Sequence, residues 1–264
     1  MVQIFSPYVE LLRKRFPASL AQIKEAGFDG VECHLIGGLR SSRNIRDVRE
    51  EVASLGLDIR FHQGWSWESG QRNLHNVILR PLGALVPVGM SLTEQVRDVG
   101  TDPVVIYGNH GRGPRRENYL YQTSSEYVHG KVSAMSFSDY VSAVKSSGLP
   151  VVFDTQHVLE WSLDTENVAG LPTSPATLKK LVEELWEELH PYVREIHLCD
   201  FDPSLGGSYG RNVFLGNGVF PLTEFATVVR ASGWSGVITP EVSFQYLHGH
   251  KLRAVREKVD QLFR

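Results

Sequence analysis

The sequence predicts an α/β protein built as one (β/α)8 barrel, and three observations carry this prediction. The chain has 264 residues, the usual length of one such barrel. A junction in which glycine follows a helix and β-branched residues begin a strand recurs four times, at residues 26–32, 55–59, 147–151 and 232–237. Several strand-like runs also stop abruptly at Asp, His or Glu, as barrel strands do when they carry a site. Repeated units of this kind indicate a parallel sheet.

In chain order, we expect eight strands, at residues 3–5, 30–34, 58–62, 104–108, 118–122, 151–154, 195–199 and 236–241. Helices between them are predicted from apolar residues at helical spacing, such as Ile45, Val48 and Val52. The barrel is expected to be irregular between strands 3 and 5. Residues 63–103 are too long for a simple connection, and residues 109–117 are too short for an ordinary helix. Because no linker or low-complexity tract interrupts the chain, we expect residues 1–264 to form a single domain.

Composition excludes several classes of protein. The net charge of -3 offers no basic surface for nucleic acid. No run of about 18 uninterrupted apolar residues could span a membrane, and no signal-peptide pattern precedes the basic residues 13–15. Cys33 and Cys199 lie in apolar runs, which indicates buried thiols in a reducing compartment. We therefore expect a cytoplasmic protein. The apolar segment 82–90 could be a lid or a subunit contact, so a homo-oligomer is possible.

Three strands in the second half of the chain end at residues that can hold a divalent metal, namely Asp154, His197 and Glu241. The carboxyl ends of parallel strands meet at one end of a barrel, so these side chains should form one cluster. Asp154 could instead cap the turn that follows it. His157, three residues further on, could contact substrate, bind metal or hydrogen-bond a loop carbonyl.

Other residues are candidates for substrate binding. His62 with Trp65 and Trp67 could form an aromatic wall for the C–H face of a sugar, or a partly buried core cluster. Glu32 alternates with apolar residues, so its side chain could face the barrel interior. Arg211 lies in a glycine-rich loop that either wraps an anionic or hydroxylated substrate or is merely flexible.

The chain resembles the xylose-isomerase-like barrels, which include sugar isomerases and epimerases and the family-2 apurinic endonucleases. The resemblance is carried by residues 27–32, 154–157, 196–200, 210–211, 216–219 and 236–241. It implies one divalent metal (Mn²⁺, Mg²⁺, Co²⁺ or Zn²⁺) held by a Glu, an Asp, a His and a Glu at the ends of strands five to eight. Asp154, His197 and Glu241 match three of these positions.

The fourth position departs from the family pattern, because Gln122 ends the fifth predicted strand. Glutamine can offer a carbonyl oxygen to a metal, but it is uncharged and cannot act as a base. If the strand were shifted, Glu117 or Glu126 would take this place. With Gln122 in position, Glu241 is the remaining strand-end base, assisted by His157. A single base disfavours two-base epimerisation and favours isomerisation on one face, or dehydration beside a carbonyl.

Three functions follow from these residues. The first is a divalent-metal-dependent, isomerase-like enzyme acting on a small carbohydrate or polyol by enediolate chemistry. The alternative is a catalytically reduced barrel that binds metal or sugar. The third, a metal-dependent phosphodiesterase, is disfavoured: Tyr107 replaces a ligand His of the endonucleases, and Gly210, Arg211 and Asn212 replace their Asp-Arg-His.

Overall fold

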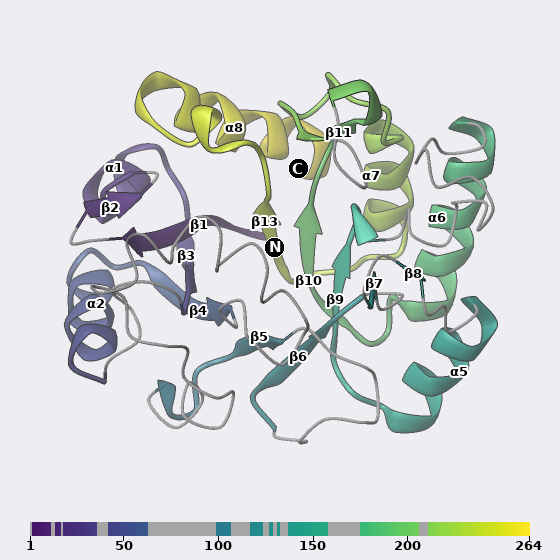
Figure 1. Ribbon diagram of the computed structural model, residues 1–264, viewed down its shortest axis with the longest axis horizontal. Helices are drawn as coiled ribbons and strands as arrows, with labels where there is room; N and C mark the ends of the chain where they lie inside the picture. Colours follow the sequence, from purple (N-terminus) through teal and green to yellow (C-terminus); the bar gives the residue numbers. More distant parts are fainter. Residues whose placement is uncertain are drawn as a thin grey trace.

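Eight parallel strands in the described part of the chain close into a barrel (Figure 1). The computed structural model describes residues 2–11, 14–16, 18–35, 42–62, 99–106, 117–123, 127–128, 131–132, 137–157, 175–205 and 211–264. The barrel strands are β1 (Gln3–Leu11), β3 (Gly30–His34), β4 (Asp58–His62), β5 (Val104–Ile106), β6 (Tyr119–Gln122), β9 (Val151–Asp154), β10 (Val193–Leu198) and β13 (Val237–Pro240). Each pairs with the next in parallel, and β13 pairs with β1 to close the ring. The predicted fold class is confirmed.

Helices cover the outside of the barrel (Figure 1). They are α1 (Leu20–Glu25), α2 (Ser42–Ser54), α5 (Phe137–Ser147), α6 (Pro175–Leu189), α7 (Leu222–Ala231) and α8 (Gly249–Phe263). The apolar stripe predicted for α2 is buried, since Ile45, Val48 and Val52 all join the main core. Apolar residues at this spacing form one helix face, which packs against the sheet.

Short elements complete the described structure. The strand β2 (Lys14–Phe16) pairs with the end of β1, β7 (Tyr127–Val128) pairs with β8 (Lys131–Val132), and β11 (Phe201–Asp202) pairs with β12 (Arg211–Asn212), each antiparallel. Two 3-10 helices, η4 (Pro203–Leu205) and η5 (Phe244–Tyr246), follow β11 and β13. Among the described residues, no helix combines the length and the apolar character that a membrane span requires.

Several strand bounds differ from the prediction. β1 runs to Leu11 because it continues beyond its pairing with β3 and then pairs with β2. β10 begins earlier, at Val193, where its register with β9 shifts before Glu195. The fifth barrel strand is placed as predicted: Gln122 ends β6 and pairs with Val152. The shifted alternative is therefore wrong for Glu117, which lies in the turn before β6, whereas Glu126 is outside the described residues.

The irregularity predicted between barrel strands 3 and 5 falls largely on residues that the structure does not describe. Residues 63–98 and 107–116 lie outside the described set, and they include Trp65, Trp67, Tyr107 and the segment 82–90.

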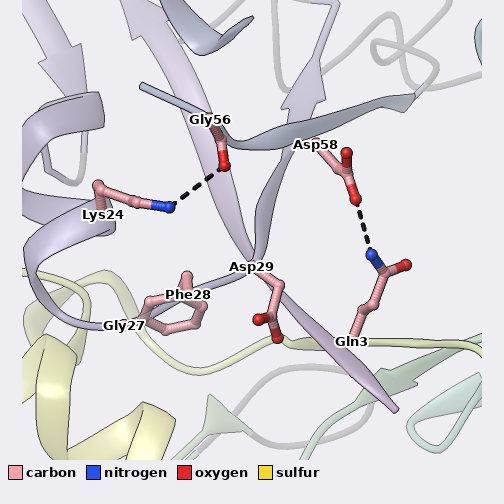
Figure 2. Close-up of a pocket in the computed structure, with 7 residues that line it drawn as sticks. All are labelled: Gln3, Lys24, Gly27, Phe28, Asp29, Gly56 and Asp58. Carbon is pink, nitrogen blue, oxygen red and sulfur yellow. Dashed lines mark hydrogen bonds between the residues drawn. The ribbon is translucent and has the colours of Figure 1, made fainter. Parts of the chain in front are cut away.

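Polar contacts hold together the amino-terminal ends of the first strands (Figure 2). Gln3 Nε2 donates a hydrogen bond to Asp58 Oδ2 at 2.7 Å, and Asp29 Oδ2 accepts one from the backbone N–H of Ile4 at 2.8 Å. Lys24 Nζ donates to the carbonyl of Gly56 at 3.2 Å. This end of a barrel is the one whose residues serve stability. The two hydrogen bonds drawn in Figure 2 are between residues that line the pocket at this end.

Candidate metal centre

The carboxyl-terminal ends of six barrel strands bring polar side chains to one place. His62, Gln122 and Asp154 are the last residues of β4, β6 and β9. His197 is the penultimate residue of β10 and pairs with Asp154 in register. Glu32 lies in β3, and Glu241 directly follows β13. All but Glu241 are buried.

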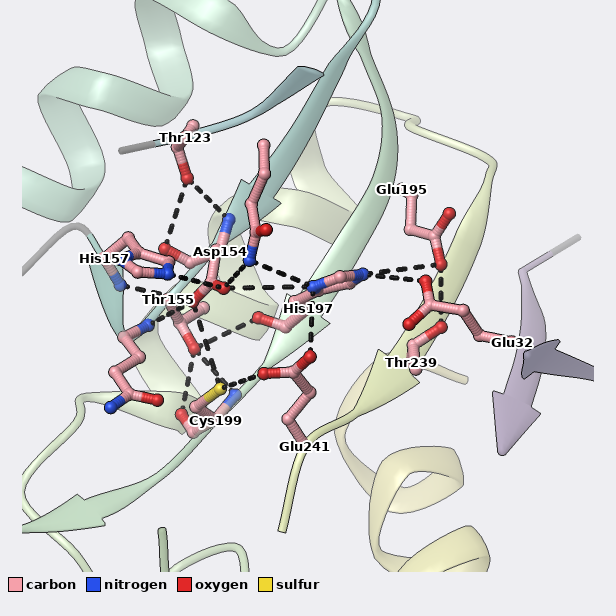
Figure 3. A network of polar contacts seen from close by, with 12 residues as sticks. Glu32, Thr123, Asp154, Thr155, His157, Glu195, His197, Cys199, Thr239 and Glu241 are labelled. Atoms are coloured by element: carbon pink, nitrogen blue, oxygen red, sulfur yellow. Dashed lines mark hydrogen bonds and ion pairs between the residues drawn. The ribbon is translucent and has the colours of Figure 1, made fainter. Parts of the chain in front are cut away.

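Three side chains converge on Nδ1 of His197, and Figure 3 labels two of them, Asp154 and Glu241. Glu241 Oε1 lies 3.2 Å from this nitrogen, and Asp154 Oδ2 lies 3.8 Å from it. Gln122 Nε2 lies 3.4 Å from it and also donates a hydrogen bond to Asp154 Oδ2. Gln122 Oε1 is buried without a hydrogen-bond partner among the described residues. The structure thus brings together the four residues that the sequence predicted as metal ligands. Gln122 Oε1 is the oxygen of this group that could accept a bond from a ligand or coordinate a metal.

On its other side, His197 contacts a third carboxylate. Glu32 Oε2 lies 2.9 Å from His197 Nε2. The ring of His62 stacks on that of His197, with centroids 5.5 Å apart. Glu32, His62, His197 and Glu241 each offer a ligand atom within 4.8 Å of the others, so the described residues include a group that could hold a metal ion.

The two sides of His197 suit different roles. A histidine that binds a metal through one ring nitrogen usually donates the other N–H to a carboxylate, which orients the ring. The hydrogen bond between Nε2 and Glu32 supplies this arrangement. It leaves Nδ1, with Asp154, Glu241 and Gln122 around it, as the nitrogen for a metal.

Burial and charge shift the pKa values of these groups. Burial raises the pKa of Glu32 to about 8, although His197 opposes the shift. Burial also raises the pKa of Glu241 above its usual value. For Asp154, burial acts in the same direction, but His157 and His197 outweigh it and lower the pKa. For His197, burial lowers the pKa, but Glu32 and Glu241 outweigh it and raise the pKa. Metal ions bind these groups in their deprotonated forms, so a metal bound here would displace any proton that the ligands carry.

The two oxygens of Asp154 have separate contacts. Oδ1 accepts hydrogen bonds from the backbone N–H groups of Gln156 and His157 at 2.8 and 3.2 Å, so Asp154 does cap the following turn. Oδ2 faces His197, as the predicted metal site requires. His157 Nε2 lies 3.7 Å from Asp154 Oδ2. The side chains of His157 and Glu241 are 25% and 23% exposed, so both can meet a molecule that enters from solvent.

Three residues that were predicted to bind substrate are either fully buried or not fully described by the structure, namely His62, Trp65 and Arg211. His62 is fully buried between His34 and His197, with ring centroids 4.5 and 5.5 Å away, which agrees with the core-cluster alternative. The backbone of Arg211 pairs with Asp202 in the hairpin of β11 and β12, but its side chain is outside the described set, as is all of Trp65. Substrate binding by these residues stays a prediction.

Two buried residues of this centre escaped the sequence interpretation. Cys199, read as a small buried residue, places Sγ 3.4 Å from Glu241 Oε2 and 3.9 Å from Asp154 Oδ1. Glu195 forms a buried ion pair with Arg60 at 2.6 Å. The available signal was alternation, since residues 195, 197 and 199 share one face of an extended strand.

Asp200, the other acidic residue after β10, has a different task. Its carboxylate accepts four backbone N–H hydrogen bonds, from Phe201 (3.0 Å), Gly216 (2.8 Å), Gly218 (2.9 Å) and Phe220 (3.1 Å). It therefore holds the segment after β12 against the end of β10 and is not part of the cluster around His197.

Comparisons with known proteins agree with this architecture. No curated protein matches the sequence. Among solved structures, a xylose isomerase-like TIM barrel/4-hydroxyphenylpyruvate dioxygenase fusion protein is 16% identical with a TM-score of 0.56; the match covers 98% of this chain and 41% of the fusion protein. The 3-keto-D-glucoside 4-epimerase YcjR from E. coli is 14% identical with a TM-score of 0.54, and the match covers 99% of each chain. An L-ribulose 3-epimerase is 13% identical with a TM-score of 0.55, covering 100% of this chain and 95% of that one.

These likenesses show the fold. The family model described as "Xylose isomerase-like TIM barrel" matches residues 118–262, more than half of the chain and the part that carries Gln122, Asp154, His197 and Glu241. The chain therefore belongs to the xylose isomerase-like TIM barrel family.

Proposed function

We propose that this protein is a divalent-metal-dependent enzyme of the sugar isomerase type, which moves a carbon-bound proton of a small carbohydrate or polyol. The observation that carries the proposal is the convergence of Asp154, Gln122 and Glu241 on His197 Nδ1, next to a partly exposed carboxylate. The solved structures with this fold include a 3-keto-D-glucoside 4-epimerase and an L-ribulose 3-epimerase, which makes small ketoses and keto-sugars the first substrates to try.

In this proposal, Asp154, His197, Glu241 and Gln122 hold the metal, and Glu32 orients His197 through its Nε2. A divalent ion (Mn²⁺, Mg²⁺, Co²⁺ or Zn²⁺) bound there supplies Lewis-acid polarisation of adjacent substrate oxygens. Gln122 contributes its unpartnered Oε1, which requires that its hydrogen bond to Asp154 be given up or rearranged.

Glu241 is the group that takes the proton from the substrate carbon and returns it. Its carboxylate is the partly exposed one of the cluster, and burial raises its pKa above the usual value, which makes it a stronger base than an ordinary carboxylate. His157, also partly exposed, lies beside Asp154 and can hydrogen-bond a substrate hydroxyl. Because Gln122 cannot serve as a second base, proton removal and return on one face are favoured. This corresponds to aldose–ketose isomerisation or to dehydration beside a carbonyl.

The first test is the metal content of the purified protein by elemental analysis, after loading and removal of excess ion. We expect about one equivalent in the wild type, and its loss in both Asp154→Ala and His197→Ala, since each removes one ligand. Absence of metal from the loaded wild type would contradict the proposal at its base.

The second test is proton exchange. Ketoses and aldoses are incubated with loaded protein in D₂O, and loss of the carbon-bound proton signal is followed by NMR. We expect exchange in the wild type, none with Glu241→Gln, and unchanged exchange with Glu224→Gln, an exposed glutamate in α7. Circular dichroism confirms that each variant is folded. Exchange that survives Glu241→Gln would remove Glu241 from its assigned role.

A second candidate function rests on Gln122, whose neutral amide replaces the family's carboxylate. In that case the barrel binds metal or sugar without turnover. Thermal stabilisation by a sugar in the absence of any proton exchange would select this alternative.

A further inference from the structure

The side chain of Asn212 joins the hairpin after β10 to the segment that follows β13. Building on the proposed function, we propose that Asn212 is a positioning residue for Glu241, because it holds the backbone of Glu241 so that the carboxylate stays beside His197. In this proposal Asn212 acts through Glu241 and not on the metal itself.

Glu241 lies just beyond the regular pairing of its strand. β13 ends at Pro240, which is paired with Leu198 at the end of the register between β13 and β10. The N–H of Glu241 still donates to the carbonyl of Leu198 at 2.9 Å, whereas the carbonyl of Glu241 lies past the end of this ladder. Other groups must therefore take over the hydrogen bonding of the backbone at this point.

Asn212 supplies the hydrogen bond on the carbonyl side. Its Nδ2 donates to the carbonyl of Glu241 at 2.9 Å. The peptide groups on both sides of the Glu241 Cα are thus fixed, one by β10 and the other by Asn212. These two peptide groups set φ and ψ at Glu241, and the backbone angles in turn limit which rotamers its side chain can adopt.

Asn212 also contacts the group that holds the carboxylate of Glu241. The same Nδ2 lies 3.9 Å from Cys199 Sγ, and the S–H of Cys199 donates to Glu241 Oε2 at 3.4 Å. The other oxygen, Glu241 Oε1, lies 3.2 Å from His197 Nδ1. Figure 3 shows the carboxylate between the sulfur and the imidazole. Asn212 therefore supports Glu241 at its backbone and, through Cys199, at its carboxylate.

The support itself is anchored. The backbone of Asn212 pairs with Phe201 in the hairpin of β11 and β12, and Ser243 Oγ donates to the carbonyl of Asn212. Two hydrogen bonds of opposite direction thus join the hairpin to the segment after β13, one from Asn212 to Glu241 and one from Ser243 to Asn212. A ligand is held precisely only when the residues that support it are themselves held, and Asn212 meets this condition.

Competition for Co²⁺ with a chromophoric chelator tests the inference without reference to activity. Asn212→Leu keeps the shape of the side chain but removes its N–H donors. We expect folded Asn212→Leu to bind Co²⁺ about 10-fold more weakly than the wild type, as is usual when a residue that orients a metal ligand is lost.

Asn118→Leu is the matched control for this variant. Asn118 lies at the start of β6, where its Nδ2 donates to the carbonyls of Gly100 and Asp102 at 3.2 and 2.9 Å. The same chemical change there should lower stability and leave the affinity for Co²⁺ unchanged. Asn212→Ala, which is smaller and also lacks the donors, replaces Asn212→Leu if circular dichroism shows that the leucine variant does not fold.

A double variant shows whether Asn212 acts through Glu241. In Glu241→Gln the carboxylate is already lost, and a neutral amide binds a divalent ion more weakly. Adding Asn212→Leu to this variant should therefore weaken Co²⁺ binding by less than about 3-fold, because the two residues act as a unit. An equal loss of affinity in both backgrounds would mean a general effect on the structure and would overturn the proposal.

The outcomes separate this inference from the proposed function. A wild type that binds no Co²⁺ overturns both. A wild type that binds Co²⁺ with the same affinity as folded Asn212→Leu overturns the role of Asn212 and leaves the metal site standing.

Discussion

Gln122 lies between Asp154 and His197 as a neutral donor, and this determines what a charge at the same position would do. Its Nε2 donates to Asp154 Oδ2, so Gln122→Glu replaces a buried hydrogen bond with two adjacent carboxylates. We expect the metal-free variant to lose about 3–5 kcal/mol of unfolding free energy, the cost of an uncompensated buried charge. A bound divalent ion should recover most of that loss, because the added carboxylate becomes a ligand.

Urea unfolding without and with Zn²⁺ measures the loss of unfolding free energy and its recovery by the metal. Gln245→Glu, on an exposed residue of η5, makes the same chemical change away from the cluster and should alter stability little. If Gln122→Glu lost the same free energy with and without the metal, Gln122 would not face the ion.

At this scale the sequence predicted part of the polar cluster around His197. Asp154, His197 and Glu241 could be found because each ends an apolar strand, and Gln122 because the fifth strand was placed correctly. The contact between Glu32 and His197 could not be found. It joins residues from strands on different sides of the barrel, and which interior side chains meet there depends on tilt and radius, which no local pattern encodes.

At the scale of elements, the corner after β10 depends on Asp200. Its two carboxylate oxygens each accept two backbone N–H groups, and Gly218 approaches so closely that an added Cβ would lie 2.2 Å from Asp200 Oδ1. In Asp200→Asn, one oxygen becomes an NH₂ group facing two N–H donors. We expect about 2–4 kcal/mol less unfolding free energy, the cost of buried donors without an acceptor.

Urea unfolding checks this prediction against Asp47→Asn, an exposed change in α2 that should stay within about 0.5 kcal/mol of the wild type. A loss no larger in Asp200→Asn than in Asp47→Asn would mean that the corner does not depend on this carboxylate. The sequence showed Asp200 only as part of the run 196–200 that carries the family resemblance. It could not show the four donors, because they arrive from a segment beyond β12 whose path is a tertiary feature.

The bounds of the strands also show that a local sequence pattern does not reveal tertiary contacts. Glycine at helix ends located the starts of four of the eight barrel strands, because the left-handed conformation that it allows is a local requirement. The extension of β1 to Leu11 was missed, since those residues become a strand only by pairing with β3 and β2. Whether a segment is a strand depends on its neighbours more than on its own composition.

At the scale of the whole molecule, the two ends of the barrel have different tasks. The polar contacts in Figure 2 tie together strand starts, whereas the candidate metal centre in Figure 3 gathers strand ends. This division was predictable from the barrel itself, in which the carboxyl-terminal end carries function and the amino-terminal end serves stability.

Arg256 tests that division, because it joins the last helix to the beginning of the chain. It is 5% exposed, its Nε donates to the carbonyl of Gly27 at 2.9 Å, and its guanidinium contacts Asp29 at 3.5 Å and pairs with Asp260. Arg256→Met keeps the length of the side chain but removes these contacts. We expect about 2–3 kcal/mol less unfolding free energy, since hydrogen bonds to charged groups are lost while both carboxylates keep some solvent.

Metal content should not follow this loss of stability. The contacts of Arg256 lie at the strand starts, so Arg256→Met should still bind one equivalent of metal in elemental analysis while it unfolds at lower urea. Arg253→Met is the matched control: the same helix loses one exposed hydrogen bond, to the carbonyl of Glu25, and should change stability by less than about 0.5 kcal/mol. Loss of metal from folded Arg256→Met would show that the two ends of the barrel are coupled, and that closure by α8 also positions the strand ends around His197.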